Sequence, residues 1–280
     1  MVLSSKALYD QFVHDIELKW GSEESEKIAQ IVFNHLFGLS RIDIFLNKSI
    51  TLLEERLIPI SKRLLKGEPV QYILNQASFF GLPFFVNPFV LIPRQETEEL
   101  VALILKENDH CTQNILDIGT GSGVIALTLQ THRPKWNVSG WDLSPEALEI
   151  AVRNANHLNL SVDFTCINIL NKSPDMDKYH LIISNPPYIP SSEKSSIPGH
   201  VVDYEPELAL FVADDHPLIF YERIAYYALK SLKKRGKLYF EINEDFVYQI
   251  QTLLSHLGFE EIAIHLDLNK KARMASAVRA

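Results

Sequence analysis

Cysteine is scarce in this sequence: Cys111 and Cys166 are the only two in 280 residues. Two cysteines exclude a disulfide-rich scaffold and a zinc site built from cysteines. The ten histidines are scattered, with no two of them within four residues of each other. The histidine spacing typical of helical metal sites is therefore absent, and we expect no bound metal.

Long apolar runs are missing as well. The most apolar stretch, Phe79–Pro93, is broken by a glycine, an asparagine and two internal prolines. It falls short of the roughly 18 uninterrupted apolar residues that a membrane span needs. The first ten residues also lack the apolar core of a signal peptide. We therefore expect a soluble, cytoplasmic protein without a membrane partner.

Positive charge is in deficit. The chain has 27 lysines and arginines against 35 aspartates and glutamates, a net charge of -8. Proteins that bind bare nucleic acid take their affinity from basic side chains that neutralise phosphates, so we expect no stable nucleic-acid partner. One basic cluster exists, at residues 230–237. We interpret it as a solvated helix end, where cations suit the negative end of the helix dipole.

The rest of the composition, 46% hydrophobic and 22% charged, is that of an ordinary globular protein of one or two domains. Residues 1–76 show apolar residues at helical spacing and no strand pattern. One stripe comprises Leu8, Phe12, Ile16 and Leu18, and the other comprises Ile28, Ile31, Val32, His35 and Leu36. We therefore predict a small all-helical N-terminal domain, which would serve as a docking surface for a large substrate.

Residues 77–92 differ in character from the helical segment. Two aromatic segments, Ser78–Phe80 and Phe84–Val86, flank Gly81–Pro83, a pattern typical of a β-hairpin. We interpret this hairpin as a linker between two domains. A buried strand pair of the main domain is the alternative.

Helices and strands alternate through the remaining chain, residues 93–280. Predicted helices cover residues 96–106, 124–130, 145–158, 218–232 and 246–257, and predicted strands cover residues 114–117, 138–141, 162–167, 179–184, 237–242, 261–266 and 275–278. The last two strands lack an intervening helix, so we expect them to pair antiparallel. The alternation predicts an α/β fold with a doubly wound, mostly parallel, seven-stranded Rossmann-like sheet.

A glycine-rich loop follows the first of these strands. It comprises Gly119, Thr120, Gly121, Ser122 and Gly123. Glycines let the chain turn sharply and let a ligand approach the backbone. The spacing Gly-x-Gly-x-Gly differs from the Gly-x-Gly-x-x-Gly of dinucleotide sites. We therefore favour S-adenosylmethionine as the cofactor, because it carries a ribose and an adenine but no phosphate.

Further cofactor contacts are expected at the ends of the next two strands. Asp142 lies roughly 20 residues beyond the loop, where an acid accepts hydrogen bonds from ribose hydroxyls. Its alternative role, capping the following helix, suits Ser144 better. Asn168 and Ile169 follow the third strand, where Asn168 would hydrogen-bond the adenine and Ile169 would cover its face. Capping of its own loop is an equally good role for Asn168.

Asn185, Pro186, Pro187 and Tyr188 follow the fourth strand, at the edge where parallel sheets bind ligands. The prolines have no N–H, so the loop offers two acceptors, the Asn185 side-chain oxygen and the Pro186 carbonyl. Two converging acceptors suit a planar NH₂ group, and Tyr188 would shield it from water. We predict Asn185, Pro186 and Tyr188 as catalytic residues, with Asn185 also at the cofactor. A rigid turn is the alternative.

Several segments resemble the peptide chain release factor protein-(glutamine-N5) methyltransferases. They are Gly67–Tyr72, Leu91–Glu98, Leu116–Gly123, Asn185–Ile189 and Glu205–Leu210. The resemblance implies a helical domain, a hairpin linker and an S-adenosylmethionine-dependent methyltransferase domain. It also implies methyl transfer to the glutamine of a Gly-Gly-Gln loop in class 1 release factors. Two positions depart from the family pattern: Asn75, where glycine is frequent, and Asn168, where an acid is common.

Such a substrate would contact Arg94, Asn185, Pro186, Pro187 and Tyr188. Arg94 can instead form an ion pair with Glu96 or Glu98. No catalytic base is evident in the sequence, so catalysis would rest on positioning and electrostatics. The Asn-Pro-Pro-Tyr segment would equally serve a nucleic-acid methyltransferase acting on adenine N6 or guanine N2, an alternative that the acidic charge disfavours. A binding module without activity is a further alternative.

Overall fold

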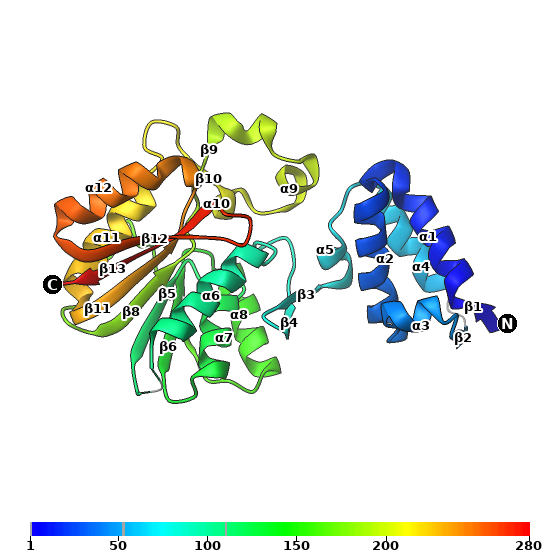
Figure 1. Cartoon of the computed structure of the whole chain (residues 1–280), viewed down its shortest axis with the longest axis horizontal. Coiled ribbons are helices and arrows are strands. Elements are labelled where there is room, and N and C mark those ends of the chain that lie inside the picture. The colour runs from blue at the N-terminus through cyan, green and yellow to red at the C-terminus, as the bar shows by residue number, and fades with distance from the viewer. Residues whose placement is uncertain (1, 52–53, 110) are drawn as a thin grey trace. The chain divides into compact units, whose positions relative to one another are not determined.

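The computed structural model describes residues 2–51, 54–109 and 111–280 and divides into two compact units (Figure 1). The first unit comprises Met1–Gln76 together with Pro198–Tyr204. The second comprises Ala77–Ile197 and Glu205–Ala280. No helix among the described residues is long and apolar enough to cross a membrane.

The first unit is largely helical. Its helices are α1 (Ser5–Trp20), α2 (Ser22–Phe37), α3 (Arg41–Phe45), α4 (Glu54–Leu65), α5 (Val70–Leu74) and the distant α9 (Gly199–Tyr204). Gly21 and Gly38, both at positive φ, end α1 and α2. The core of this unit includes Phe12, Ile16, Ile28, Val32, Phe33 and Leu64.

Two details of the helical prediction are wrong. A short antiparallel pair, β1 (Val2–Ser4) with β2 (Ser49–Thr51), interrupts the helices, so the unit is not all-helical. Three-residue strands are too short to show an alternating pattern. Leu18 is fully exposed, because it lies two residues beyond Ile16 and so points away from the apolar face that Phe12 and Ile16 share.

The predicted hairpin is formed by β3 (Gln76–Phe79) and β4 (Leu82–Phe85). Phe79 and Phe84 are completely buried in a core cluster of the second unit. The Asn154 side chain holds both backbone groups of Phe85, accepting from its N–H at 2.7 Å and donating to its carbonyl at 3.0 Å. The hairpin is therefore packed into the second unit.

Within the described residues, the second unit is built around a seven-stranded sheet with the order β12-β13-β11-β8-β5-β6-β7. Its strands are β5 (Asn114–Ile118), β6 (Asn137–Asp142), β7 (Asp163–Cys166), β8 (Tyr179–Ser184), β11 (Leu232–Glu241), β12 (Phe259–Leu266) and β13 (Ala272–Arg279). β13 pairs antiparallel with β11 and β12, whereas β5, β6, β7, β8 and β11 pair parallel. The predicted fold class is confirmed.

Helices cover both faces of this sheet (Figure 1). They are α6 (Gln95–Glu107), α7 (Val124–His132), α8 (Pro145–His157), α11 (Ile219–Ser231) and α12 (Val247–Leu257). Residues of α6, α7 and α8 contribute to one core cluster, and residues of α11 and α12 contribute to the other. Because the sheet is covered on both faces, its inner strands consist of apolar runs.

The segment between β8 and α11 contains short elements that the sequence pattern does not predict. It contains β9 (Ile189–Pro190), the 3₁₀ helix η1 (Ser191–Ser196), α9, α10 (Glu207–Leu210) and β10 (Phe211–Val212), and β9 pairs parallel with β10. A second 3₁₀ helix, η2 (Glu244–Phe246), precedes α12. These pieces are too short for a periodic sequence signal.

The basic cluster at residues 230–237 does not form a helix end as predicted. Helix α11 stops at Ser231, and most of the cluster lies in an irregular stretch of β11, where the register with β8 shifts between Leu232 and Lys237. Arg235 adopts a positive φ there and pairs with Glu260 and Glu261.

Tight packing beneath the glycine-rich loop generates a stability prediction. A Cβ at Gly140 of β6 would lie 2.7 Å from the Phe164 ring and 2.8 Å from the Thr120 hydroxyl. We expect Gly140→Ala to reduce the free energy of unfolding by about 1–3 kcal/mol, as overpacking does. Gly199→Ala is the control, because its Cβ would meet only ordinary contact at 3.8 Å. Denaturant unfolding checks this; equal midpoints for both variants would contradict it.

Candidate active site

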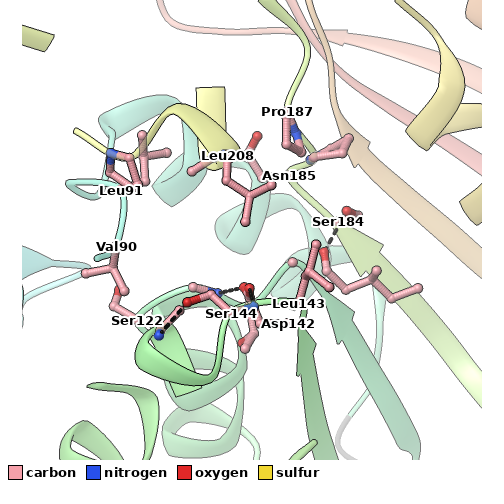
Figure 2. Close-up of a pocket in the computed structure, with 18 of the residues that line it drawn as sticks. Val90, Leu91, Ser122, Asp142, Leu143, Ser144, Ser184, Asn185, Pro187 and Leu208 are labelled. Atoms are coloured by element: carbon pink, nitrogen blue, oxygen red, sulfur yellow. Dashed lines mark hydrogen bonds between the residues drawn. The ribbon is translucent and has the colours of Figure 1, made fainter. Parts of the chain in front are cut away.

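A cavity of about 340 Å³ opens at the carboxyl ends of the parallel strands. It collects most of the predicted site residues: Arg94, Gly119, Thr120, Gly121, Ser122, Asp142, Asn168, Ile169, Asn185, Pro186 and Pro187. Figure 2 shows Asp142 and Ser144 on one side of this cavity and Leu91 and Leu208 on the other. Gly123 and Tyr188 were also predicted for the site, but they are not among the described residues that line the cavity.

The glycine-rich loop is fixed by its own backbone. The N–H groups of Gly119 and Thr120 both donate to the Trp141 carbonyl, at 2.8 and 2.9 Å. Gly119 has a φ of 75°, and a Cβ there would lie 3.9 Å from the Asn185 carbonyl oxygen. The loop after β5 therefore runs close to the loop after β8.

Gly123 has a packing role. It has a φ of 83°, and a Cβ there would lie 3.0 Å from Leu127 and 3.2 Å from Phe164. The helix α7 begins directly after it. Gly123 therefore permits close contact of helix and strand, one of the uses of glycine in such loops.

Asp117 is a buried acid beneath the loop that the sequence analysis did not single out. Its Oδ2 accepts a hydrogen bond from the Thr120 hydroxyl at 2.7 Å. Burial raises the pKa of Asp117 to about 7, the nearby charge of Asp142 adds to the rise, and hydrogen bonds from Thr120 and the Ala126 N–H oppose it. Asp117 directly follows two apolar residues of the predicted strand, Ile115 and Leu116. This position in the sequence could have indicated that its side chain is buried.

Asp142 ends β6 and holds two backbone groups. Its Oδ2 accepts from the Gly121 N–H at 2.8 Å, and its Oδ1 accepts from the Ser144 N–H at 3.0 Å. Ser144 caps α8 as expected, accepting from the Ala147 N–H at 3.0 Å. Burial raises the pKa of Asp142, and the backbone N–H groups of Ser144 and Gly121 oppose the rise. Each carboxylate oxygen keeps capacity for a second donor, so the site can still accept from two hydroxyls.

Asn168 and Ile169 both line the cavity. The Asn168 side-chain oxygen accepts from the Leu170 N–H at 2.9 Å, which caps the loop and leaves the amide nitrogen as a donor. Ile169 is 7% exposed and lines the cavity with its apolar side chain. Asn154, which the sequence analysis missed, donates to the Ser122 carbonyl at 2.9 Å and so ties the glycine-rich loop to the hairpin.

The Asn185 side chain is held in place by hydrogen bonds to buried side chains. Its Nδ2 donates to the Thr97 hydroxyl at 3.2 Å, and that hydroxyl donates to Glu241 Oε2 at 2.6 Å. Tyr188 packs against the core cluster next to α11, and burial raises the pKa of its hydroxyl. Neither Thr97 nor Glu241 was singled out from the sequence. The only hint in the sequence is that each is a polar residue in an element that is otherwise buried.

Arg94 pairs with an acid that the sequence did not suggest. Its Nη2 lies 2.5 Å from Glu205 Oε1, and Glu205 Oε2 accepts from the Ile92 N–H at 3.1 Å. The expected partners, Glu96 and Glu98, are replaced by a residue 111 positions away. The Glu205 side chain is 1% exposed and the Arg94 side chain 35%, so this partly buried pair links the loop before α6 to the loop before α10.

The cavity fits a nucleoside without phosphate. Apolar side chains and loop backbone form most of its lining, and Asp142 supplies a carboxylate for hydroxyl groups. Among the described residues, Arg94 is the single basic side chain in the lining, and its charge is neutralised by Glu205. No cluster of three or more potential metal ligands occurs within the described part of the chain.

This combination of fold and site defines an S-adenosylmethionine-dependent methyltransferase. A methyltransferase from Pyrococcus furiosus shares the fold, with a TM-score of 0.54 at 18% identity over 79% of this chain and 98% of that chain. Residues 96–200 match the family described as methyltransferase small domain, and residues 18–74 match the PrmC N-terminal domain.

Full-length relatives narrow the class. Release factor glutamine methyltransferases from Bacteroides thetaiotaomicron and Flavobacterium psychrophilum are 40% and 38% identical to this chain. The alignments cover 92% and 94% of this chain and 94% and 95% of the relatives. The enzyme of that name from Streptococcus pneumoniae is 44% identical over 81% of each chain. The chain belongs to the release factor glutamine methyltransferase family.

The geometry of Asp142 generates a binding prediction. We expect Asp142→Ala to weaken S-adenosylmethionine binding by about 1–3 kcal/mol, because it removes charge-assisted hydrogen bonds and releases the Gly121 N–H. Isothermal titration calorimetry measures the change. Asp163→Ala is the matched control, since Asp163 is an exposed acid on the neighbouring strand β7. An unchanged affinity for Asp142→Ala would remove this carboxylate from the cofactor site.

Proposed function

We propose that this chain transfers a methyl group from S-adenosylmethionine to the side-chain amide nitrogen of the glutamine in the Gly-Gly-Gln loop of class 1 release factors. The observation that carries the proposal is the orientation of Asn185. Its nitrogen is engaged by Thr97, which leaves its oxygen to act as an acceptor in the cavity. Family membership supports the same substrate.

The acceptors of the loop match the substrate group. A primary amide is planar and has two N–H donors. In this proposal one of them donates to Asn185 Oδ1 and the other to the Pro186 carbonyl, and Pro187 adds no competing donor. Tyr188 supports the loop from the core side. The amide nitrogen is thereby aimed toward the glycine-rich loop that runs beside Asn185.

Cofactor contacts in this proposal follow the cavity lining. The backbone of residues 119–122 approaches the cofactor, Asp142 accepts from the ribose, and Asn168 and Ile169 face the adenine. Arg94 lines the cavity and pairs with Glu205, and its remaining N–H groups would be the donors for the substrate. Gly123 acts indirectly by allowing α7 to pack.

The chemistry requires little from side chains beyond placement. When bound, S-adenosylmethionine supplies a methyl group on a positively charged sulfur, which is already a good leaving group. The two acceptors hold the amide nitrogen in line and interact more strongly with its hydrogens as positive charge develops on nitrogen. The proton then leaves to water.

The substrate assignment predicts where label goes. We expect label from methyl-labelled S-adenosylmethionine to enter a purified class 1 release factor and to be lost when its loop glutamine is changed to alanine. Unmethylated DNA and ribosomal RNA should remain unlabelled, because the chain carries a net charge of -8 and Arg94 is the one basic residue among the described residues that line the cavity. Label in nucleic acid, or undiminished label in the alanine variant, would contradict the proposal.

We also propose that residues 1–76 act as a docking domain for the body of the release factor, with residues 77–92 leading into the catalytic domain of residues 93–280. Support comes from an apolar surface at α3. Its side chains are strongly exposed: Ile42 is 70% exposed, Phe45 79% and Leu46 70%. Clustered exposed apolar side chains mark interaction surfaces.

Docking predicts a substrate-size effect. Phe45→Glu should raise KM for the intact release factor about tenfold, a loss typical of an interface aromatic. Transfer to a short Gly-Gly-Gln peptide should not change, because the peptide lacks the body of the release factor that would dock. Tyr248→Glu is the control, since Tyr248 is 78% exposed on α12 in the other unit. Equal KM values for Phe45→Glu and wild type would show that the release factor does not dock on the apolar surface at α3.

A further inference from the structure

Three polar side chains form a chain of hydrogen bonds that ends at the catalytic loop. Glu241 lies at the end of β11, Thr97 lies in the first turn of α6, and Asn185 follows β8. Asn185 Nδ2 donates to Thr97 Oγ1 at 3.2 Å, and Thr97 Oγ1 donates to Glu241 Oε2 at 2.6 Å. Thr97 is 4% exposed and Glu241 2%, so water does not compete for these bonds.

We propose that Thr97 and Glu241 are positioning residues that fix which end of the Asn185 amide faces the substrate. The inference rests on the proposed function, in which Asn185 must present oxygen to the substrate NH₂ group. An asparagine amide is nearly symmetric in shape, and rotation by half a turn exchanges its oxygen for its nitrogen. With the nitrogen in the cavity, two donors would face each other and the substrate would be repelled.

The direction of these two hydrogen bonds follows from the number of hydrogens that each side chain can donate. An ionised carboxylate only accepts hydrogen bonds, and a threonine hydroxyl has one hydrogen to donate. The Thr97 hydrogen therefore goes to Glu241, and the Thr97 oxygen is left to accept from Asn185 Nδ2. Ionised Glu241 thus orients Thr97, and Thr97 orients Asn185 with its oxygen toward the cavity.

A purely structural role does not account for this arrangement. A buried carboxylate costs free energy unless a cation or several donors compensate for it. Among the described residues, no lysine or arginine forms an ion pair with Glu241. An apolar side chain would fill the position at a lower cost, so a polar acceptor here points to a role in orienting the site.

The surroundings of Glu241 set the pH range in which the hydrogen bonds from Asn185 to Thr97 and from Thr97 to Glu241 keep this donor direction. Burial raises the pKa of Glu241 to about 7; Glu96 of α6 adds to the rise, and Thr97, Arg273 of β13 and Asn185 oppose it. The hydroxyls of Tyr188 and Tyr221 also face this carboxyl, and Tyr221 donates to the Glu241 backbone carbonyl at 3.1 Å.

The sign of the pH effect follows from this. Below pH 7 the Glu241 carboxyl is protonated and can donate to Thr97, which reverses the chain and turns the Asn185 nitrogen toward the cavity. Methyl transfer should therefore fall as the pH drops through about 7 and level off above it. Asp117 titrates in the same range, so the assignment needs a variant of Glu241 itself.

The first test replaces the hydroxyl that links the two ends. Thr97→Val keeps the shape of the side chain and should lower kcat about tenfold, in line with the loss of one orienting hydrogen bond. The dissociation constant for S-adenosylmethionine should stay within about twofold of wild type, because Thr97 orients the substrate acceptor. Thr97→Ser keeps the hydroxyl and should restore kcat to within about threefold. Asn185→Ala marks the kcat expected when the acceptor is absent.

Thr128→Val is the matched control. Thr128 is a buried threonine of α7, and its hydroxyl has no hydrogen-bond partner among the described residues. This control should keep wild-type kcat. The proposal is overturned if Thr97→Val keeps wild-type kcat, if cofactor affinity falls in parallel with kcat, or if Thr97→Ser does not rescue activity.

The second test is the pH profile of kcat between pH 5.5 and 8.5. Wild type should show an inflection near 7, whereas Glu241→Gln should lose this inflection because its side chain does not titrate. Glu241→Gln adds no charge and keeps the side-chain shape, so it remains informative if Thr97→Val folds poorly. An inflection at the same pH in Glu241→Gln would overturn the assignment to Glu241.

A third measurement does not depend on the release factor. In protein labelled with ¹⁵N-asparagine, the Asn185 side-chain NH₂ signal, assigned by its loss in Asn185→Ala, should shift with an apparent pKa near 7 and should stop shifting in Thr97→Val. If this titration occurs but no release factor is labelled, the proposed function fails while the positioning chain stands. If the signal does not respond to pH or to Thr97→Val, the positioning chain fails by itself.

Discussion

Parallel pairing of β5 with β8 is the constraint on which the site depends. The register places Ile118 beside Ser184 at the ends of the two strands, and the Ser184 hydroxyl donates to the Ile118 carbonyl at 2.7 Å. The glycine-rich loop and the Asn-Pro-Pro-Tyr loop leave the sheet directly after these residues. Because both strands point the same way, their loops must emerge side by side. The loops that carry the proposed cofactor and substrate contacts meet for this reason, although 66 residues separate Ile118 from Ser184 in the chain.

The sequence predicted the parts of the site that follow directly from strand ends. Asp142, Asn185 and the glycine-rich loop could be placed because each comes after a recognisable apolar strand, and the topology then brings them together. Side-chain pairs from distant segments could not be predicted. Thr97 and Glu241 are 144 residues apart, and a polar residue in a buried element does not reveal its partner. The alternative expectation for Arg94, an ion pair with Glu96 or Glu98, was wrong for the same reason, since only the folded chain brings Glu205 to it.

Errors in the fold prediction also have physical causes. Periodicity identifies helices and strands of several turns or several residue pairs, so the elements of the central sheet were found. The pair β1–β2, the strands β9 and β10 and the short helices α9 and α10 contain too few residues for a period to show. Leu18 was assigned to an apolar stripe from its type alone, yet its place on the helix turns it to solvent.

We infer that two parts of the cavity contribute differently to substrate selection. In the proposed mechanism the Asn185 and Pro186 acceptors recognise any planar NH₂ group, so they do not by themselves distinguish a glutamine from a nucleobase. The wall opposite Asp142 carries Leu91, from the loop before α6, and Leu208, from helix α10 (Figure 2). Glu205 links these two segments, because it lies just before α10 and binds both Ile92 and Arg94. An apolar wall suits the flexible stem of a glutamine better than a flat, polar base. The acidic chain adds no attraction for phosphate. We therefore propose that selection for a protein substrate depends on the loop before α6 and on α10, and that the reaction geometry depends on the Asn-Pro-Pro-Tyr loop after β8.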